Sequence, residues 1–410
     1  MVMRAASLDS LLPDDHRARV VWEFVVGVDL APLYAGIRSV EGHAGHDAAD
    51  PRIMLALWLY ATLEGVGSAR QLARLCEAHV AYQWICGGVS MNYHTLSDFR
   101  VGHPEFLDRL LTQSVATLMH EGLVTLDRVA QDGMRVRASA GAASFRRRKT
   151  LEECQAEAKE QVDALAQELE EDPASSHRRQ DAARRRAARE RSERIQQALT
   201  ELAEIEAKKK AEEKAQVRVS TTEPEARVMK MGDGGFRPAH NVEFATDTQS
   251  QVIAGVDVVN VGSDQGQMPP MVEQLEARYD KTPGEVLVDG GFAKHDDIET
   301  VSAAEAGTKV YAPVPKPKKD SDRDPHQPLP GDSQMIAEWR VRMGTPEAKE
   351  IYKDRASTAE CVNAISRNRG LRQFLVRGLR KVRAVVLWFA IAHNLMRAVA
   401  LRAEAAVATT

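Results

Sequence analysis

Two aspartates in this sequence each follow a short apolar run and precede a glycine. Asp132 lies in "RVAQDGMRVRA" (128–138), and Asp289 lies in "VLVDGGF" (286–292). A carboxylate at a strand end is either a turn residue or part of a ligand site, because open α/β sheets bind ligands at their strand termini. Carboxylates that hold two divalent ions can support cleavage of a phosphodiester. The pair therefore indicates metal-assisted phosphoryl chemistry, provided that a third acid joins it.

The segment "IYKDRASTAECVNAISRNRG" (351–370) supplies a third acid, Glu360, near the start of an expected helix. Tyr352 and Arg355 precede it, and Arg367 follows seven residues later on the same helical face. A glutamate in this position is also typical of a solvated surface or of a first-turn partner of the helix dipole. The residues around Glu360 decide between these interpretations.

Together, these acids and the Tyr-x-x-Arg spacing before Glu360 resemble the DDE transposases of bacterial insertion sequences. The resemblance is to the branch with a Tyr-Arg-Glu-Lys motif around the third acid, and it extends over about residues 30–400. It includes the stretches "HTLSDFR", "HNVEFATDTQSQVIAG" and "WFAIAHNLMR".

This sequence departs from the family motif at two points. Four residues rather than three separate Arg355 from Glu360, and Arg367 stands where the family usually has lysine. Arginine binds phosphate well but is not equivalent to lysine. Because of the longer spacing, Glu350 and Asp354, which lie before the expected helix, are the alternatives to Glu360.

The resemblance implies an α/β fold with an RNase H-like mixed-sheet core and a catalytic, metal-binding triad of Asp132, Asp289 and Glu360. It implies Mg²⁺ as the cofactor, with Mn²⁺ as the alternative ion. The implied activity is metal-dependent DNA cleavage and strand transfer at insertion-sequence ends. The implied partners are double-stranded DNA, as transposon ends and target, and a second copy of the chain in a DNA-bound homodimer.

The elements expected around these residues form an α/β core. Residues 240–261 alternate apolar and polar side chains about a central turn and predict a β-hairpin. Residues 308–314 predict another strand, residues 315–334 a loop rich in Pro, Asp and Lys, and the chain from Ser357 onward is expected to be helical. The catalytic core is expected to span residues 121–402, followed by a short tail at 403–410.

Residues 146–216 are expected to interrupt this core as a helical hairpin. Apolar residues recur there at spacings of three and four, and "EDPASSH" (171–177) breaks the pattern. Residues 151–172 are mainly acidic, whereas residues 178–194 are rich in arginine. Antiparallel packing pairs the two charges, which favours a structural hairpin over an arm that binds nucleic acid.

Residues 1–120 are expected to form an all-helical domain that binds DNA. One helix ends at Gly65, and a second starts with Ser68 as its N-cap. This pattern suggests a helix-turn-helix, in which Arg70 and Arg74 are exposed to a DNA groove, although an ordinary helical bundle gives the same pattern. Thr95 is expected to cap a further helix. Cys76, His79 and Cys86 resemble zinc ligands only loosely, and buried helix residues explain them better.

The segment after Glu360 is strongly basic and predicts salt-sensitive contact with phosphates. Part of the run is also consistent with arginine side chains that extend over an apolar helix. The residues assigned to DNA contact are Tyr352, Arg355, Arg367, Arg377, Arg380, Arg383, Arg70 and Arg74.

Composition limits the class of protein. A chain of 410 residues with 43% hydrophobic residues can build more than one domain, and a net charge of −4 does not decide for or against a polyanionic partner. Four scattered cysteines argue against a disulfide framework and for a reducing compartment. The longest apolar run, at 384–392, is far shorter than the roughly 20 residues that span a bilayer. We expect a soluble, cytoplasmic protein without a membrane segment.

Two other functional classes remain open. One is a DNA-binding or scaffold protein with an inactive transposase-derived core, and the other is a metal-dependent nuclease without strand transfer. Asp257, Asp247 and Asp233 are interpreted as structural acids. His240 and Asn241 either approach the site or cap the hairpin.

Overall fold

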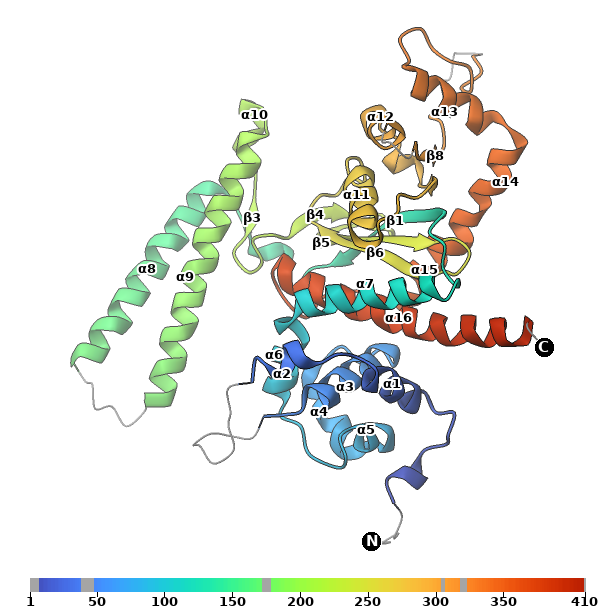
Figure 1. Ribbon diagram of the computed structural model, residues 1–410. Helices are drawn as coiled ribbons and strands as arrows, with labels where there is room; N and C mark the ends of the chain where they lie inside the picture. The colour runs from blue at the N-terminus through green and yellow to red at the C-terminus, as the bar shows by residue number, and fades with distance from the viewer. Residues whose placement is uncertain (1–6, 38–47, 172–177, 304–306, 318–322, 409–410) are drawn as a thin grey trace.

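The computed structural model describes residues 7–37, 48–171, 178–303, 307–317 and 323–408. Helices occupy the N-terminal part, and a mixed sheet and further helices form the rest (Figure 1). The helices are α1 (Arg17–Val26), α2 (Ala31–Tyr34), α3 (Pro51–Leu63), α4 (Ala69–Ala78), α5 (Val80–Ile85), α6 (Tyr93–Gly102), α7 (Pro104–His120), α8 (Arg148–Glu171), α9 (Arg178–Ala207), α10 (Ala211–Lys214), α11 (Met268–Tyr279), α12 (His295–Ala303), α13 (Gln334–Gly344), α14 (Pro346–Arg355), α15 (Cys361–Asn368) and α16 (Leu379–Ala408).

The main sheet has the strand order β4-β5-β1-β7-β8, and β6 pairs with β5 beside β4. Its strands are β1 (Arg128–Arg137), β4 (Arg227–Lys230), β5 (Phe236–Asp247), β6 (Ile253–Val259), β7 (Glu285–Leu287) and β8 (Lys309–Tyr311). β1 is antiparallel to β5 and parallel to β7, and β7 is parallel to β8. β5 and β6 are antiparallel, which confirms the predicted hairpin. The expected α/β class is thus confirmed as a mixed sheet with helices.

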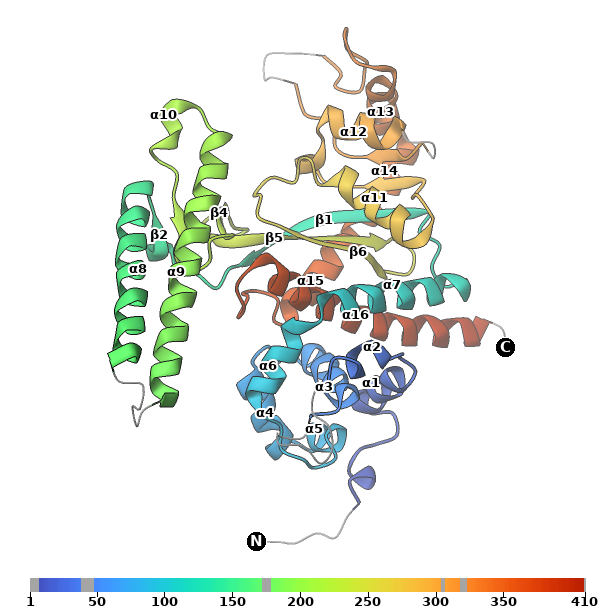
Figure 2. The same cartoon turned by 60° about the vertical axis from the view of Figure 1, so that its left-hand side comes forward.

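Helices cover both faces of this sheet (Figures 1 and 2). α11 and α12 lie on one face, and α7 and α16 lie on the other, with α1–α6 packed beneath α16. The N-terminal helices share one apolar core with the rest of the chain, because Trp58 and Trp388 are both fully buried in it. The indole N–H of Trp388 donates to the carbonyl oxygen of Arg100 at 2.9 Å, and this bond ties α16 to α6.

α16 is the central helix of this core. By length and composition alone it could cross a membrane, but 72% of its most apolar 18-residue stretch is buried inside the fold. It packs against α3, α6, α7 and β6, so its apolar surface already has partners. The helix continues to Ala408, so residues 403–408, expected as a tail, are helical.

α8 and α9 form a hairpin that projects from one edge of the sheet (Figure 1). The chain leaves through β2 (Phe145–Arg146) and returns through β3 (Val219–Ser220), which pair with each other. Three ion pairs join the arms in reverse sequence order: Arg148–Glu206 at 2.6 Å, Glu157–Arg191 at 3.4 Å and Glu168–Arg184 at 3.6 Å. This order confirms the predicted antiparallel pairing over the described residues, whereas the predicted break at residues 172–177 lies outside them.

Three local predictions were wrong. β1 does not end at Asp132 but runs to Arg137, because the long strand β5 supplies a partner for its whole second half. Thr95 is not an N-cap, because the side chain of Asn92 accepts from the backbone N–H of His94 and starts α6 earlier. Helix resumes at Gln334 rather than near Ser357 and is interrupted over residues 369–378.

Candidate active site

Asp132 lies on β1, and Asp289 lies just past the end of the adjacent parallel strand β7. The last residues that pair β1 with β7 are Ala130 and Leu287, and each aspartate lies two residues further on. Asp289 lies two residues past the end of β7 and caps the short 3₁₀ turn η3 (Gly290–Phe292), where its Oδ1 accepts from the Gly291 N–H at 2.7 Å. More than 150 residues separate the two aspartates in sequence. They still come close because the α8–α9 hairpin leaves and returns on the side of β1 away from β7.

A helical segment ties these two strands to the third acid. The hydroxyl of Tyr352 on α14 donates to the carbonyl oxygen of Val288, next to Asp289, at 3.1 Å. The guanidinium of Arg355 donates to Glu360 Oε1 at 2.6 Å and lies 3.8 Å from Asp132 Oδ1. Arg355 therefore links Asp132 with Glu360, although the Glu360 side chain is 55% exposed.

The longer spacing between Arg355 and Glu360 coincides with a π-helical turn, η4 (Ala356–Glu360), between α14 and α15. A π turn closes hydrogen bonds from i to i+5, so it takes one more residue than an α turn. The fifth residue after Arg355 then lies on the face that the fourth residue occupies in an α-helix. The π turn thus accommodates the fourth residue between Arg355 and Glu360, and Glu360 still faces Arg355.

The other two candidates for the third acid have different partners. Glu350 pairs with Lys353 at 2.6 Å on an exposed part of α14, and Asp354 pairs with Arg128 at 2.9 Å. Both were expected to lie before a helix, but both lie within α14. Of the three acids, Glu360 is the one that Arg355 joins to Asp132.

Three residues that sequence reasoning did not select also surround Asp132. Asn363 on α15 donates to Asp132 Oδ2 at 2.9 Å. Asp264, in the loop before α11, and Glu243 on β5 crowd Gly133: a Cβ atom on this glycine would lie 2.5 Å from Asp264 Oδ1 and 2.7 Å from Glu243 Oε1. Gly133 is therefore required by the close approach of two carboxylates and not by a turn.

A buried polar network holds these carboxylates. Asn241 donates to Glu243 at 2.6 Å and to Asp264 at 2.9 Å, so it approaches the site as one alternative predicted. Arg135 pairs with Asp264 at 2.8 Å. His240 does not join the network, because its ring hydrogen bonds to Glu223 at 2.8 Å in a fully buried pair.

The electrostatics of the site follow from converging negative charge. Burial raises the pKa of Asp132 to about 6; Arg355 opposes this rise, and the nearby Asp289 and Asp264 carboxylates add to it. Burial, reinforced by Asp264, raises the pKa of Glu243 to about 8. A cation at this position would offset the repulsion between Asp132 and its neighbours.

The donor set fits Mg²⁺ or Mn²⁺ by its chemistry. Carboxylate oxygens are the hard ligands that these ions prefer, and two or three of them suffice when water completes the shell. Within the described residues, no three His, Cys, Asp or Glu side chains are arranged closely enough to hold an ion as they stand. The geometry accounts for this, since Glu360 is held by Arg355 at the exposed edge of the site.

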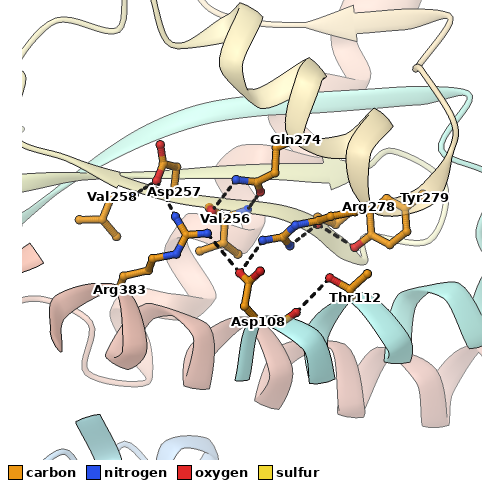
Figure 3. Close-up of polar contacts among 10 residues, drawn as sticks. Asp108, Thr112, Val256, Asp257, Val258, Gln274, Arg278, Tyr279 and Arg383 are labelled. Carbon is orange, nitrogen blue, oxygen red and sulfur yellow. Dashed lines mark hydrogen bonds and ion pairs between the residues drawn. The ribbon is translucent and has the colours of Figure 1, made fainter. Parts of the chain in front are cut away.

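The C-terminal arginines assigned to DNA contact are engaged with the protein. Arg377 donates to the carbonyl oxygen of Ser139 at 3.1 Å, and Arg380 pairs with Glu105 at 3.0 Å. Arg383 binds two carboxylates, Asp108 at 3.1 Å and Asp257 at 2.9 Å (Figure 3). The contacts of Arg380 and Arg383 join α16 to α7 and β6, and a role of these arginines in DNA binding stays a prediction.

The remaining basic candidates lie at the surface. Arg70 and Arg74 are exposed on α4, and the Arg70 guanidinium lies 5.0 Å from the centre of the Tyr93 ring. Ser68 caps α4 as predicted, accepting from the Gln71 N–H. Arg367 is exposed in the last turn of α15.

The acids interpreted as structural have structural partners. Asp247 accepts from the backbone N–H and hydroxyl of Ser250 in the turn between β5 and β6. Asp233 pairs with Arg237 at 2.7 Å in the turn before β5, and Asp257 pairs with Arg383. His79 is also structural, because its ring caps α5.

Two parts of the chain match known protein families. Residues 6–101 match a family described as "Transposase domain (DUF772)", and residues 322–399 match a "Transposase DDE domain". These two matches support an insertion-sequence DDE transposase. Glu360 lies in the second match, and Asp132 and Asp289 lie between the two. No significant match was found among curated proteins or among solved structures.

The two transposase domains indicate a transposase of a mobile element, and a transposase acts on DNA. The narrower placement in the Tyr-Arg-Glu-Lys branch stays a prediction. Sequence reasoning missed Asn363, Glu243 and Asp264 because none of them belongs to a motif. Of these three residues, only Asp264 has a local sequence feature that could have pointed to the site, since it lies in a polar loop shortly before the helix α11.

Proposed function

We propose that this transposase cleaves and rejoins DNA strands at the ends of an insertion sequence, with Asp132, Asp289 and Glu360 as its catalytic, metal-binding triad. The observation that carries the proposal is the register of β1 and β7, which sets the two aspartates beside each other. Arg355 also contacts both Asp132 and Glu360, so it links the third acid to the first.

The strand order supports an RNase H-like core. Three antiparallel strands, β6, β5 and β1, are followed by two strands, β7 and β8, parallel to β1. In this arrangement one acid is on the central strand, one lies two residues past its parallel neighbour, and one comes from a helical segment late in the chain. The helical hairpin of α8 and α9 is then an insertion in the core at residues 146–216.

Each residue of the site is assigned a separate role in the proposed reaction. Asp132, Asp289 and Glu360 would hold Mg²⁺ or Mn²⁺, which supplies Lewis acidity and neutralises charge on the phosphate oxygens. Arg355 keeps two acids near each other and places a cation beside the reacting phosphate. Tyr352 fixes the backbone ahead of Asp289, and Asn363 orients Asp132.

We further propose that residues 1–120 recognise the transposon ends, with Arg70 and Arg74 of α4 in a DNA groove. Residues 121–402 would provide catalysis, and a homodimer would hold the two ends together. The cytoplasm, where the element's DNA lies, would be the site of action.

The test uses the full chain and a duplex that carries the inverted repeats flanking its coding region. With Mg²⁺ the wild type is expected to cut at the repeat ends and to join them to a target duplex. Asp132→Asn, Asp289→Asn and Glu360→Gln each remove one charge with little change of shape. All three should lose cleavage and keep DNA binding.

Asp257→Asn is the matched control, because it removes a carboxylate of β6 that pairs with Arg383 instead of facing the site. This variant should retain cleavage. Cleavage by Glu360→Gln would assign the third ligand to another residue. Binding without cleavage by the wild type would indicate a DNA-binding protein with an inactive core, and cleavage without joining would indicate a nuclease.

A further inference from the structure

A cavity of about 260 Å³ lies where the N-terminal helices meet the segment that follows Glu360. One wall is the turn between α3 and α4, and the other is the non-helical stretch after α15. Gly65 and Gly370 have left-handed φ values of 73° and 96°, and a Cβ atom on Gly370 would lie 3.3 Å from the Gly65 carbonyl oxygen. Both glycines are needed for this close contact, so the two walls are held in fixed relative positions.

The charges in this cavity are of one sign. Three arginines line it, Arg100, Arg369 and Arg372, and no aspartate or glutamate is among its described lining residues. Arg372 reaches the cavity from a loop and donates to the carbonyl oxygen of Arg367 at 3.0 Å. A cavity of this kind favours an anion.

Arg100 is the strongest indication of a missing partner. It is only 7% exposed, it stacks over the Trp58 ring with its Cζ 4.7 Å from the centre, and it donates to the Gly67 carbonyl oxygen. Its Nε is buried and has no hydrogen-bond partner, and the same holds for Nη1 of Arg369. A guanidinium removed from water costs free energy unless an anion or acceptor compensates it.

The wall formed by α4 adds to this preference. Ser68, Gln71 and the two residues before Ser68 line the cavity, so the N-terminal turn of a ten-residue helix faces it. Backbone N–H groups and the helix dipole make such a terminus attractive to phosphate. Water occupies roughly 30 Å³ per molecule in the liquid, so the cavity has ample room for a phosphate group.

We propose that this cavity binds a backbone phosphate of duplex DNA between Arg100, Arg369 and the N-terminus of α4. The choice of DNA over free phosphate rests on the proposed function, in which duplex DNA is the substrate. The far wall is also joined to the catalytic strand: the Arg137 N–H donates to the Arg372 carbonyl oxygen at 3.1 Å, and the Phe374 N–H donates to the Arg137 carbonyl oxygen at 2.8 Å. A phosphate held here positions DNA relative to β1 and Asp132.

The test measures duplex binding by the full chain in EDTA, so that cleavage does not contribute, over a range of salt concentrations. Removing one bound phosphate reduces the slope of log K against log salt by about 0.9. Between 50 and 200 mM salt, the fold decrease in the binding constant should therefore be about 3.5 times smaller for Arg369→Gln than for the wild type. Arg100→Gln should show the same smaller salt slope, provided that far-UV circular dichroism shows that this variant folds. If Arg100→Gln does not fold, the result for Arg369→Gln alone tests the proposal.

Arg402→Gln is the control, since it removes an exposed arginine that pairs with Glu121 and lies outside the cavity. It should leave the salt slope unchanged. Thermal unfolding with inorganic phosphate alone forms the second arm: phosphate should stabilise the wild type more than Arg369→Gln. An unchanged slope for Arg369→Gln overturns the proposal, and phosphate stabilisation with an unchanged slope assigns the cavity to free phosphate. Because the binding experiment is done in EDTA, absence of cleavage in the triad experiment leaves this result intact.

Discussion

Asp132 and Asp289 come into register because β1 and β7 pair through Ala130 and Leu287, two residues before each acid. The pairing with β7 then stops, but β1 continues beside β5 as far as Arg137. Asp132 is therefore held within a strand and does not lie at its end. A strand fixes a side chain more firmly than a loop does, which suits a residue whose position must match a partner on another strand.

Gly133 gives the first prediction. Replacing it with alanine puts a Cβ atom within 2.5 Å of Asp264 and 2.7 Å of Glu243. Because neither carboxylate has room to retreat in the buried network, we expect a loss of about 1–3 kcal/mol in the free energy of unfolding. Urea unfolding measures it. Cleavage should fall as well, since Asp132 is the adjacent residue.

Gly141→Ala is the control for Gly133→Ala, because no atom lies within 4 Å of its added Cβ. It should change neither stability nor cleavage by a measurable amount. Equal stability of the two alanine variants would show that the carboxylates beside Gly133 move freely.

The C-terminal arginines give a second prediction. Replacing Arg377, Arg380 and Arg383 with alanine should weaken binding to all duplexes and lower the salt slope by up to about 0.9 for each phosphate that the variant no longer binds. Arg383→Ala alone should also reduce stability, because it leaves Asp257 without its ion pair (Figure 3). An unchanged slope in the triple variant would limit these residues to their contacts within the protein.

His393 gives a prediction about pH. Burial lowers its pKa from 6.5 to about 4, where its ring donates to the Gln251 carbonyl oxygen at 2.8 Å. The folded state then binds fewer protons than the unfolded state between pH 6.5 and 4, so the stability present above pH 6.5 is lost as the pH falls. At pH 5 the loss should be about 2 kcal/mol.

The measurement for His393 is urea unfolding at pH 7.5 and at pH 5, with His393→Gln for comparison. Glutamine does not titrate, so the difference between the two proteins isolates the histidine from the carboxylates. A wild type and variant that lose the same stability between these pH values would show that His393 stays accessible to protons.

Much of this architecture follows from local patterns. The hairpin of α8 and α9 could be predicted because its arms carry opposite charge and regular apolar spacing, and both properties belong to the arms themselves. The pairing of β5 with β6 could be predicted from alternation about one turn. The pairing of the strands that lead to Asp132 and Asp289 could be predicted because the resemblance to a family supplied the strand order, which the residues themselves do not contain.

The rest depends on contacts between distant segments. Gly133 looks like a turn residue in sequence, and only the approach of Glu243 and Asp264 reveals why it lacks a side chain. The free Nε of Arg100 likewise depends on how α6 packs against α3 and α4. Asn92 and Thr95 are both favourable N-cap residues by type, and the sequence alone does not show that Asn92 is the one that caps α6.

The π turn η4 gives the last prediction. Deleting Ala356, which is exposed, leaves three residues between Arg355 and Glu360 and allows the turn to become α-helical. Glu360 then lies four residues after Arg355, on the same face, so the ion pair and cleavage should survive. Circular dichroism checks that the variant folds, and cleavage of the end duplex measures whether Glu360 still acts. Inserting one alanine after Ala356 instead rotates Glu360 by about 100° relative to Arg355. The insertion should abolish cleavage while DNA binding remains. If the deletion abolishes cleavage, the fifth residue of the turn is required in its own right, and the interpretation of η4 as an absorbed insertion is wrong.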